Sequence, residues 1–73
     1  MFEKIQEIIV EVLGVEKDSV TMDSNLMNDL NADSLDALDI ATQIEESLSV
    51  KIPDEDFAKF ETVKDIVEYI ENH

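Results

Sequence analysis

Three residue types that often build catalytic sites, histidine, cysteine and arginine, are nearly missing from this chain of 73 residues. It has no cysteine and no arginine, and its one histidine is the last residue, His73. Chain ends tend to fray, so His73 is a poor candidate for a general base. The sequence therefore lacks the parts from which a nucleophile and an oxyanion site are built, and we do not expect an enzyme.

Ser34 is the most informative residue, because it lies between Asp33 and Leu35 at the expected start of a helix. Serine is common at helix starts, so its ordinary interpretation is a helix-terminal residue. The functional interpretation is an attachment point. A phosphodiester on this hydroxyl would meet free backbone N–H groups and the positive end of the helix dipole. The hydroxyl would need no local base if another enzyme carried out the transfer.

One motif resembles a metal site and then fails. Asp29, Asn31 and Asp33 have the spacing of the first three ligands of a calcium-binding helix-loop-helix loop. The sixth position of that loop needs glycine and is Ser34, and the twelfth needs a bidentate glutamate and is Ile40. We therefore predict no dedicated metal site. Weak divalent-ion binding would follow from charge density alone.

The charge is strongly negative, with 19 acidic residues against five lysines and a formal net charge of −14. Such a surface repels phosphates, so we expect neither nucleic-acid binding nor insertion into an anionic membrane. Residues 18–50 contain eight acidic side chains and no lysine. This stretch is either a solvated face or a docking surface for basic patches on partner proteins, and its position around Ser34 favours docking.

Hydrophobic spacing and capping residues predict the elements that must position Ser34. Residues 2–13 read as an amphipathic helix closed by Gly14, and residues 15–33 as a long loop anchored by Val15, Val20, Leu26 and Leu30. A second helix begins at Ser34, with Asp33 as its N-cap and a core stripe of Ala37, Ala41, Ile44 and Leu48.

The C-terminal third holds two more predicted helices. Pro53 follows an extended link and opens a short turn of helix carrying Phe57 and Phe60. Thr62 and Asp65 form a capping-box-like start for the last helix. We predict an all-α fold of one domain, residues 1–73: a small bundle of three main helices and one short third helix, with a long loop between the first two.

The segment Asp29-Leu30-Asn31-Ala32-Asp33-Ser34-Leu35-Asp36 closely resembles the phosphopantetheine attachment segment of acyl carrier proteins. The resemblance covers nearly the whole chain. It includes the first helix ending at Leu13-Gly14-Val15, the Glu45-Glu46 pair, Ile52-Pro53-Asp54-Glu55 and the start of the last helix at Thr62-Val63.

The resemblance implies a cytoplasmic, monomeric carrier of type II fatty-acid synthesis. Ser34 would receive 4'-phosphopantetheine from coenzyme A through a separate magnesium-dependent phosphopantetheinyl transferase, the holo-acyl-carrier-protein synthase. The arm's terminal thiol would hold the growing acyl chain as a thioester, so the sulfur that this chain lacks would arrive with the cofactor. Fatty-acid synthesis and acyltransferase enzymes with basic docking patches would be the other partners.

Two groups of site residues follow from the resemblance. The expected docking residues lie around Ser34 and along the second helix: Asp33, Leu35, Asp36, Asp39, Glu45 and Glu46. The expected acyl pocket lies between the second and third helices: Leu38, Ala41, Ile44, Ile52, Phe57, Phe60 and Ile66. Plain core packing is the alternative for the second group.

Several residues depart from the family's pattern. Asn31 replaces a usual glycine, which is compatible with the left-handed backbone that asparagine tolerates. Thr42 replaces a usual apolar residue, Leu48 a usual phenylalanine and Lys51 a usual acidic residue. Phe57 and Phe60 replace smaller residues. The aromatic pair either compensates for Leu48 or narrows the acyl pocket. A D-alanyl, polyketide or peptidyl carrier is the alternative within the class, and an unmodified acidic interaction or ion-buffering domain is the alternative outside it.

Overall fold

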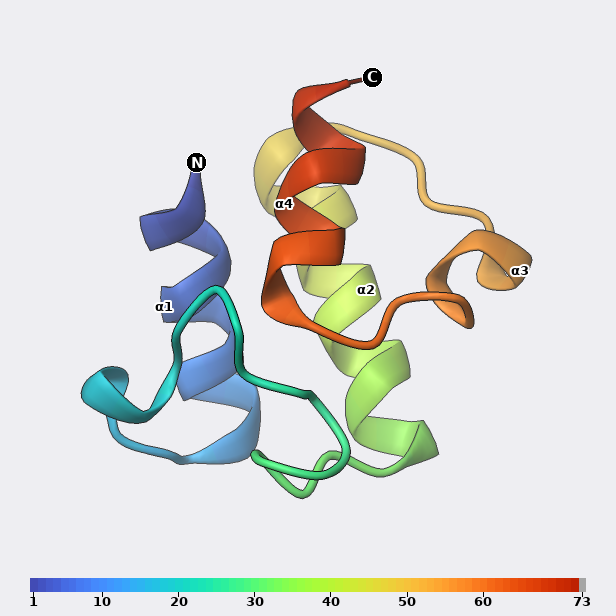
Figure 1. Ribbon diagram of the computed structural model, residues 1–73. Coiled ribbons are helices and arrows are strands. Elements are labelled where there is room, and N and C mark those ends of the chain that lie inside the picture. The colour runs from blue at the N-terminus through green and yellow to red at the C-terminus, as the bar shows by residue number, and fades with distance from the viewer. Residues whose placement is uncertain (73) are drawn as a thin grey trace.

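The computed structural model describes residues 1–72 and has the all-α architecture that the sequence predicts. His73 lies outside the described residues. Figure 1 shows the helices in chain order. They are α1 (Phe2–Leu13), α2 (Ser34–Leu48), the short α3 (Asp54–Phe57) and α4 (Val63–Glu71), with a 3₁₀ turn, η1 (Lys17–Ser19), in the first loop. The sequence did not indicate η1.

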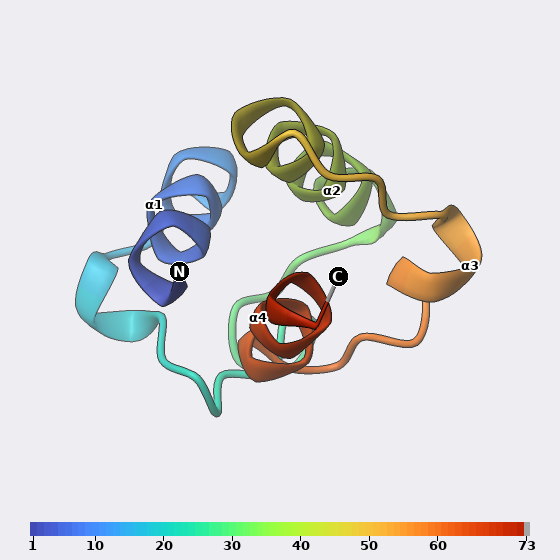
Figure 2. The same ribbon diagram turned by 90° about the horizontal axis from the view of Figure 1, so that it is seen from above.

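The three long helices surround one core. Seen from above in Figure 2, α1 and α2 lie next to each other and α4 lies across from both, while α3 lies on the side of the molecule away from α1. Within residues 1–72, no helix is both long and apolar enough to cross a membrane.

The predicted end of α1 and the predicted starts of α2 and α4 are confirmed, whereas α3 ends at Phe57 and leaves Phe60 outside the helix. Gly14 has a φ of 68°, and its N–H donates to the carbonyl of Val10 at 2.8 Å, which closes α1. Asp33 and Asp36 form a reciprocal capping box at the start of α2, and Thr62 and Asp65 form another at the start of α4. Both starts are therefore fixed by local side-chain hydrogen bonds.

The core is built mainly from isoleucine and valine. Its most deeply buried side chains are Ile5, Ile9, Val20, Ile40, Ile44, Val63 and Ile66. The expected α2 stripe differs from the observed one, since Ile40, Ala41 and Ile44 are buried while Ala37 and Leu48 are only half-buried. A stripe read from spacing fixes one face of a helix, but the neighbouring helices decide which edge of that face turns inward.

The long loop between α1 and α2 is held by three anchors that were predicted, Val20, Leu26 and Leu30, all of them buried. Val15 is only half-buried. The buried amide of Gln6 adds two unpredicted bonds, donating to the carbonyls of Lys17 and Val20 at 2.9 Å each. The loop also pairs with the segment before α4, where the Leu26 N–H donates to the carbonyl of Glu61 at 2.9 Å. These contacts fix the path that leads to Ser34.

Candidate functional site

Ser34 is the first residue of α2, and its side chain is exposed. The chain reaches it through Leu30 and Ala32, both buried, and through Asn31, whose φ of 57° is the left-handed conformation expected at this position. The Ala32 N–H donates to the carbonyl of Leu26 at 2.9 Å. Within residues 1–72 the Ser34 hydroxyl has no hydrogen-bond partner. A free hydroxyl is thus presented on a fixed backbone.

A phosphate on Ser34 would be attracted by the start of α2 and repelled by the neighbouring carboxylates of Asp33 and Asp36. The Asp33 carboxylate accepts from the Asp36 N–H at 2.9 Å, and the Asp36 carboxylate accepts from the Asp33 N–H at 3.4 Å. Helix geometry leaves the N–H groups of Ser34 and Leu35 without intrahelical acceptors. A phosphate ester on the Ser34 oxygen would meet those donors and the helix dipole, flanked by two carboxylates already held by the cap. The site fits a phosphodiester, and both carboxylates accept from backbone N–H groups of the cap and not from the Ser34 hydroxyl.

The described residues hold no metal centre. No group of three or more acidic, histidine or cysteine side chains in residues 1–72 is arranged to hold an ion. Asp29, the first residue of the calcium-like motif, instead accepts from the backbone N–H of Asn25 at 2.8 Å. Its carboxylate therefore stabilises a turn of the loop.

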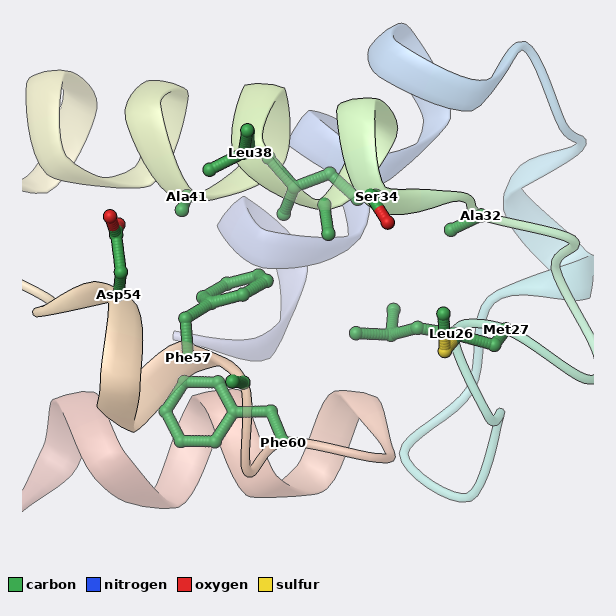
Figure 3. A pocket seen from close by; sticks show the side chains of 12 residues that line it. Leu26, Met27, Ala32, Ser34, Leu38, Ala41, Asp54, Phe57 and Phe60 are labelled. Carbon is green, nitrogen blue, oxygen red and sulfur yellow. The ribbon is translucent and has the colours of Figure 1, made fainter.

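A cavity of about 390 Å³ opens beside Ser34. Figure 3 shows it between α2 and α3, with Leu26 and Met27 of the loop at one end and Ala41 and Asp54 at the other. Ser34 and Asp54 are the only polar residues of its wall. The full lining is Leu26, Met27, Ala32, Ser34, Ala37, Leu38, Ile40, Ala41, Asp54, Phe57, Ala58 and Phe60. An apolar group attached at Ser34 therefore has an apolar space next to it.

Four of the seven residues predicted for an acyl pocket line this cavity: Leu38, Ala41, Phe57 and Phe60. Ile44, Ile52 and Ile66 do not line it. They are buried in the hydrophobic core to which several cavity residues also belong. Leu26, Met27 and Ala32 were not predicted as cavity residues, since they come from the loop and reach the cavity only through the loop's path.

The side of the cavity formed by α3 is joined to α4 through aromatic rings and one hydrogen bond. Phe57 and Phe60 are in edge-to-face contact with ring centroids 5.3 Å apart, and Phe60 meets Tyr69 at the same separation. The Tyr69 hydroxyl donates to the Asp56 carboxylate at 2.9 Å, which raises the pKa of Tyr69. Tyr69 is not among the site residues that the sequence predicts.

The predicted docking residues are not equivalent in the structure. Asp33, Leu35, Asp39 and Glu46 are exposed, and Leu35 is 72% exposed. Asp36 is half-buried in the capping box. Glu45 is also half-buried, and its carboxylate accepts from the backbone N–H of Ile52 at 2.8 Å. The free acidic side chains on α2 are therefore fewer than the sequence indicates.

Comparisons with known proteins agree with this geometry. A family described as the phosphopantetheine attachment site matches residues 3–70. An acyl carrier protein of Clostridium perfringens is 49% identical over 73 residues, which is all of this chain and 96% of that protein. An acyl carrier protein of Phytoplasma mali is 44% identical over all of this chain and 87% of its own length.

The fold is also found among solved structures. The solution structure of an Anaplasma phagocytophilum protein assigned as an acyl carrier protein superposes with a TM-score of 0.84 at 38% identity. The match covers 94% of this chain and 82% of the other.

Proposed function

Because this chain belongs to the acyl carrier protein family, whose members are carriers with a phosphopantetheine attachment site, we propose that Ser34 is the attachment residue and that the carried group is a fatty acyl chain. The observation behind the first part is the free Ser34 hydroxyl at the start of α2. The observation behind the second is the cavity beside it, whose wall is apolar except for Ser34 and Asp54.

The chain's own residues have two tasks in this proposal. When bound, 4'-phosphopantetheine from coenzyme A supplies the thiol that forms the thioester, which a chain without cysteine does not provide. Ser34 holds the phosphate of that arm near the first N–H groups of α2. The cavity removes apolar carbon of the carried chain from water, which stabilises the loaded protein.

The partners in this proposal are a phosphopantetheinyl transferase and the fatty-acid synthesis and acyltransferase enzymes, all in the cytoplasm. The docking surface consists of Asp33, Leu35, Asp39 and Glu46, the exposed members of the predicted set. Charge of one sign on this surface would speed encounter with basic patches, while the exposed carboxylates would gain little binding energy after contact. A carrier that visits several enzymes needs both properties.

Intact mass spectrometry tests the attachment. The purified chain is incubated with coenzyme A, Mg²⁺ and a phosphopantetheinyl transferase, and we expect a mass increase of one phosphopantetheine. The Ser34→Ala variant should show no increase, whereas Ser47→Ala, which removes another exposed serine of α2, should be modified like the parent. Absence of the increase with several transferases, or its presence in Ser34→Ala, would contradict the proposal.

A further inference from the structure

We propose that Phe57 sets the length of acyl chain that the cavity accepts. Its ring forms part of the cavity wall and cannot move aside without breaking contacts that join α3 to α4. This inference rests on the proposed function, in which the phosphopantetheine arm on Ser34 carries the acyl chain. It adds a specificity-determining residue to that function. The contacts that carry it are those of Phe57, Phe60, Tyr69 and Asp56.

Phe57 is the largest buried side chain in the cavity wall. It is 9% exposed, and Figure 3 shows its ring between α2 and the ring of Phe60. The wall residues at the mouth are different, since Met27 and Leu38 are 62% and 52% exposed. Exposed side chains change rotamer easily, whereas a packed ring must displace its neighbours. The cavity can therefore widen at its mouth but is limited at Phe57.

Phe57 is restrained by one contact of its ring and by a hydrogen bond of the residue before it. Its edge-to-face contact with Phe60 continues to Tyr69 on α4 through a second contact of the same kind. The Tyr69 hydroxyl then returns to α3 by donating to the carboxylate of Asp56, the residue before Phe57. The three rings and this hydrogen bond form a closed clamp.

The backbone of α3 supports the same arrangement. The Asp56 and Phe57 N–H groups both donate to the carbonyl of Pro53, at 2.9 and 3.0 Å, and the Phe60 N–H donates to the carbonyl of Phe57 at 3.0 Å. Rotation of Phe57 out of the cavity would therefore separate it from Phe60 or pull α3 from α4. A linear chain that enters beside Ser34 must pass the Phe57 ring to reach the end of the cavity at Ala41 and Asp54. The space left beside this ring limits the length that is held, and further carbons stay in water.

A covalent length series tests this limit without any enzyme. The chain has no cysteine, so Ser34→Cys introduces a unique thiol at the rim of the cavity. Linear alkyl methanethiosulfonates of increasing length are coupled to it as mixed disulfides, and the melting temperature of each adduct is measured. We expect the melting temperature to rise with chain length and then to level off at the length that the cavity holds.

Phe57→Leu, made in the Ser34→Cys background, should move the levelling point to longer chains by about one carbon, because the smaller side chain leaves space that the alkyl chain fills. Ala37→Leu should move it to shorter chains, because Ala37 lines the same cavity. Phe2→Leu is the matched control, since Phe2 is packed against the core on α1 and does not line the cavity. It should lower the melting temperature of every adduct and leave the levelling point unchanged.

Tyr69→Phe tests the clamp, because it keeps the ring contact and removes the hydrogen bond to Asp56. We expect the levelling to become less sharp and to extend to longer chains. An identical levelling point in the parent, Phe57→Leu and Ala37→Leu would overturn the inference, as would an equal shift in Phe2→Leu or no dependence on length. Failure of Ser34 to accept phosphopantetheine would instead overturn the attachment proposal, because this series uses no transferase.

Discussion

The carboxylate of Glu45, near the end of α2, accepts a hydrogen bond of 2.8 Å from the backbone N–H of Ile52 in the link to α3. Ile52 is buried, so this N–H has lost its water and needs the acceptor. Glu46, the next residue, is exposed. Two adjacent glutamates that appear equivalent in the sequence therefore differ, since Glu45 holds the link to α3 and Glu46 is free to meet a partner.

The first prediction separates these roles. Glu45→Ala should lower the free energy of unfolding by about 1–3 kcal/mol, because it leaves the buried Ile52 N–H unpaired. Glu46→Ala removes only an exposed charge and should change it by less than about 0.5 kcal/mol. Urea denaturation of both variants measures the difference. Equal effects would show that the Glu45 bond does not contribute.

The second prediction concerns docking. Asp39→Lys combined with Glu46→Lys reverses two exposed charges of α2 outside the cap and should slow modification by the transferase on the order of tenfold at low salt. The rate should also depend less on ionic strength. Glu7→Lys with Glu11→Lys gives the same net charge from exposed positions of α1 and is the matched control. Equal slowing by the two pairs would mean that net charge, and not this surface, guides the encounter.

The third prediction divides two functions of Asp33. Asp33→Asn keeps an oxygen that can accept from the Asp36 N–H, so stability should change little while transferase encounter slows. Asp33→Ala removes the cap as well and should cost about 1 kcal/mol of stability. Thermal unfolding and modification rates, measured on both variants, test this. A large loss of stability in Asp33→Asn would contradict it.

The fourth prediction follows from the cap of α4. The Asp65 carboxylate accepts from the N–H groups of Glu61 and Thr62 at 2.9 and 3.1 Å, and these bonds hold its pKa below the ordinary value of 3.8. A lowered folded-state pKa stabilises the protein above pH 3.8, and this contribution is lost as the pH falls through the folded-state value. The stability difference between the parent and Asp65→Asn should therefore shrink below that pH. Urea titrations above and below pH 3.8 measure this difference. A difference that is the same at both pH values would show that the Asp65 carboxylate does not stabilise the fold in this way.

The fifth prediction concerns the whole charge. At a net charge of −14 the acidic side chains of the folded chain repel one another, so added NaCl should raise the melting temperature. If screening removes about 1 kcal/mol of this repulsion, the rise for a domain of this size is about 5 °C. MgCl₂ should act at lower concentration, since a divalent ion screens more strongly. Calorimetry in the two salts provides the measurement. A melting temperature independent of both salts would show that the repulsion is already relieved.

Much of the fold could be predicted because its signals are local. The start of α2 at Asp33 and Ser34 and the start of α4 at Thr62 depend on residues within one helical turn, and Gly14 ends α1 by its own conformation. The positive φ of Asn31 was likewise expected, whereas that of Ser49 was not, because serine carries no comparable preference. The proposed attachment residue also comes from a local motif.

The sequence by itself determined the four helices, the caps at Gly14, Asp33 and Thr62, the acidic composition and the position of Ser34 at a helix start. Only the tertiary structure decided which residues line the cavity, because its wall combines residues from 26 to 60 that the loop path and the helix rotations bring together. It also gave Glu45 a structural hydrogen bond that Glu46 lacks, and it brought the Tyr69 hydroxyl to the carboxylate of Asp56. The physical reason is that periodicity and capping act over one turn, whereas burial and hydrogen-bond partners depend on how distant segments pack.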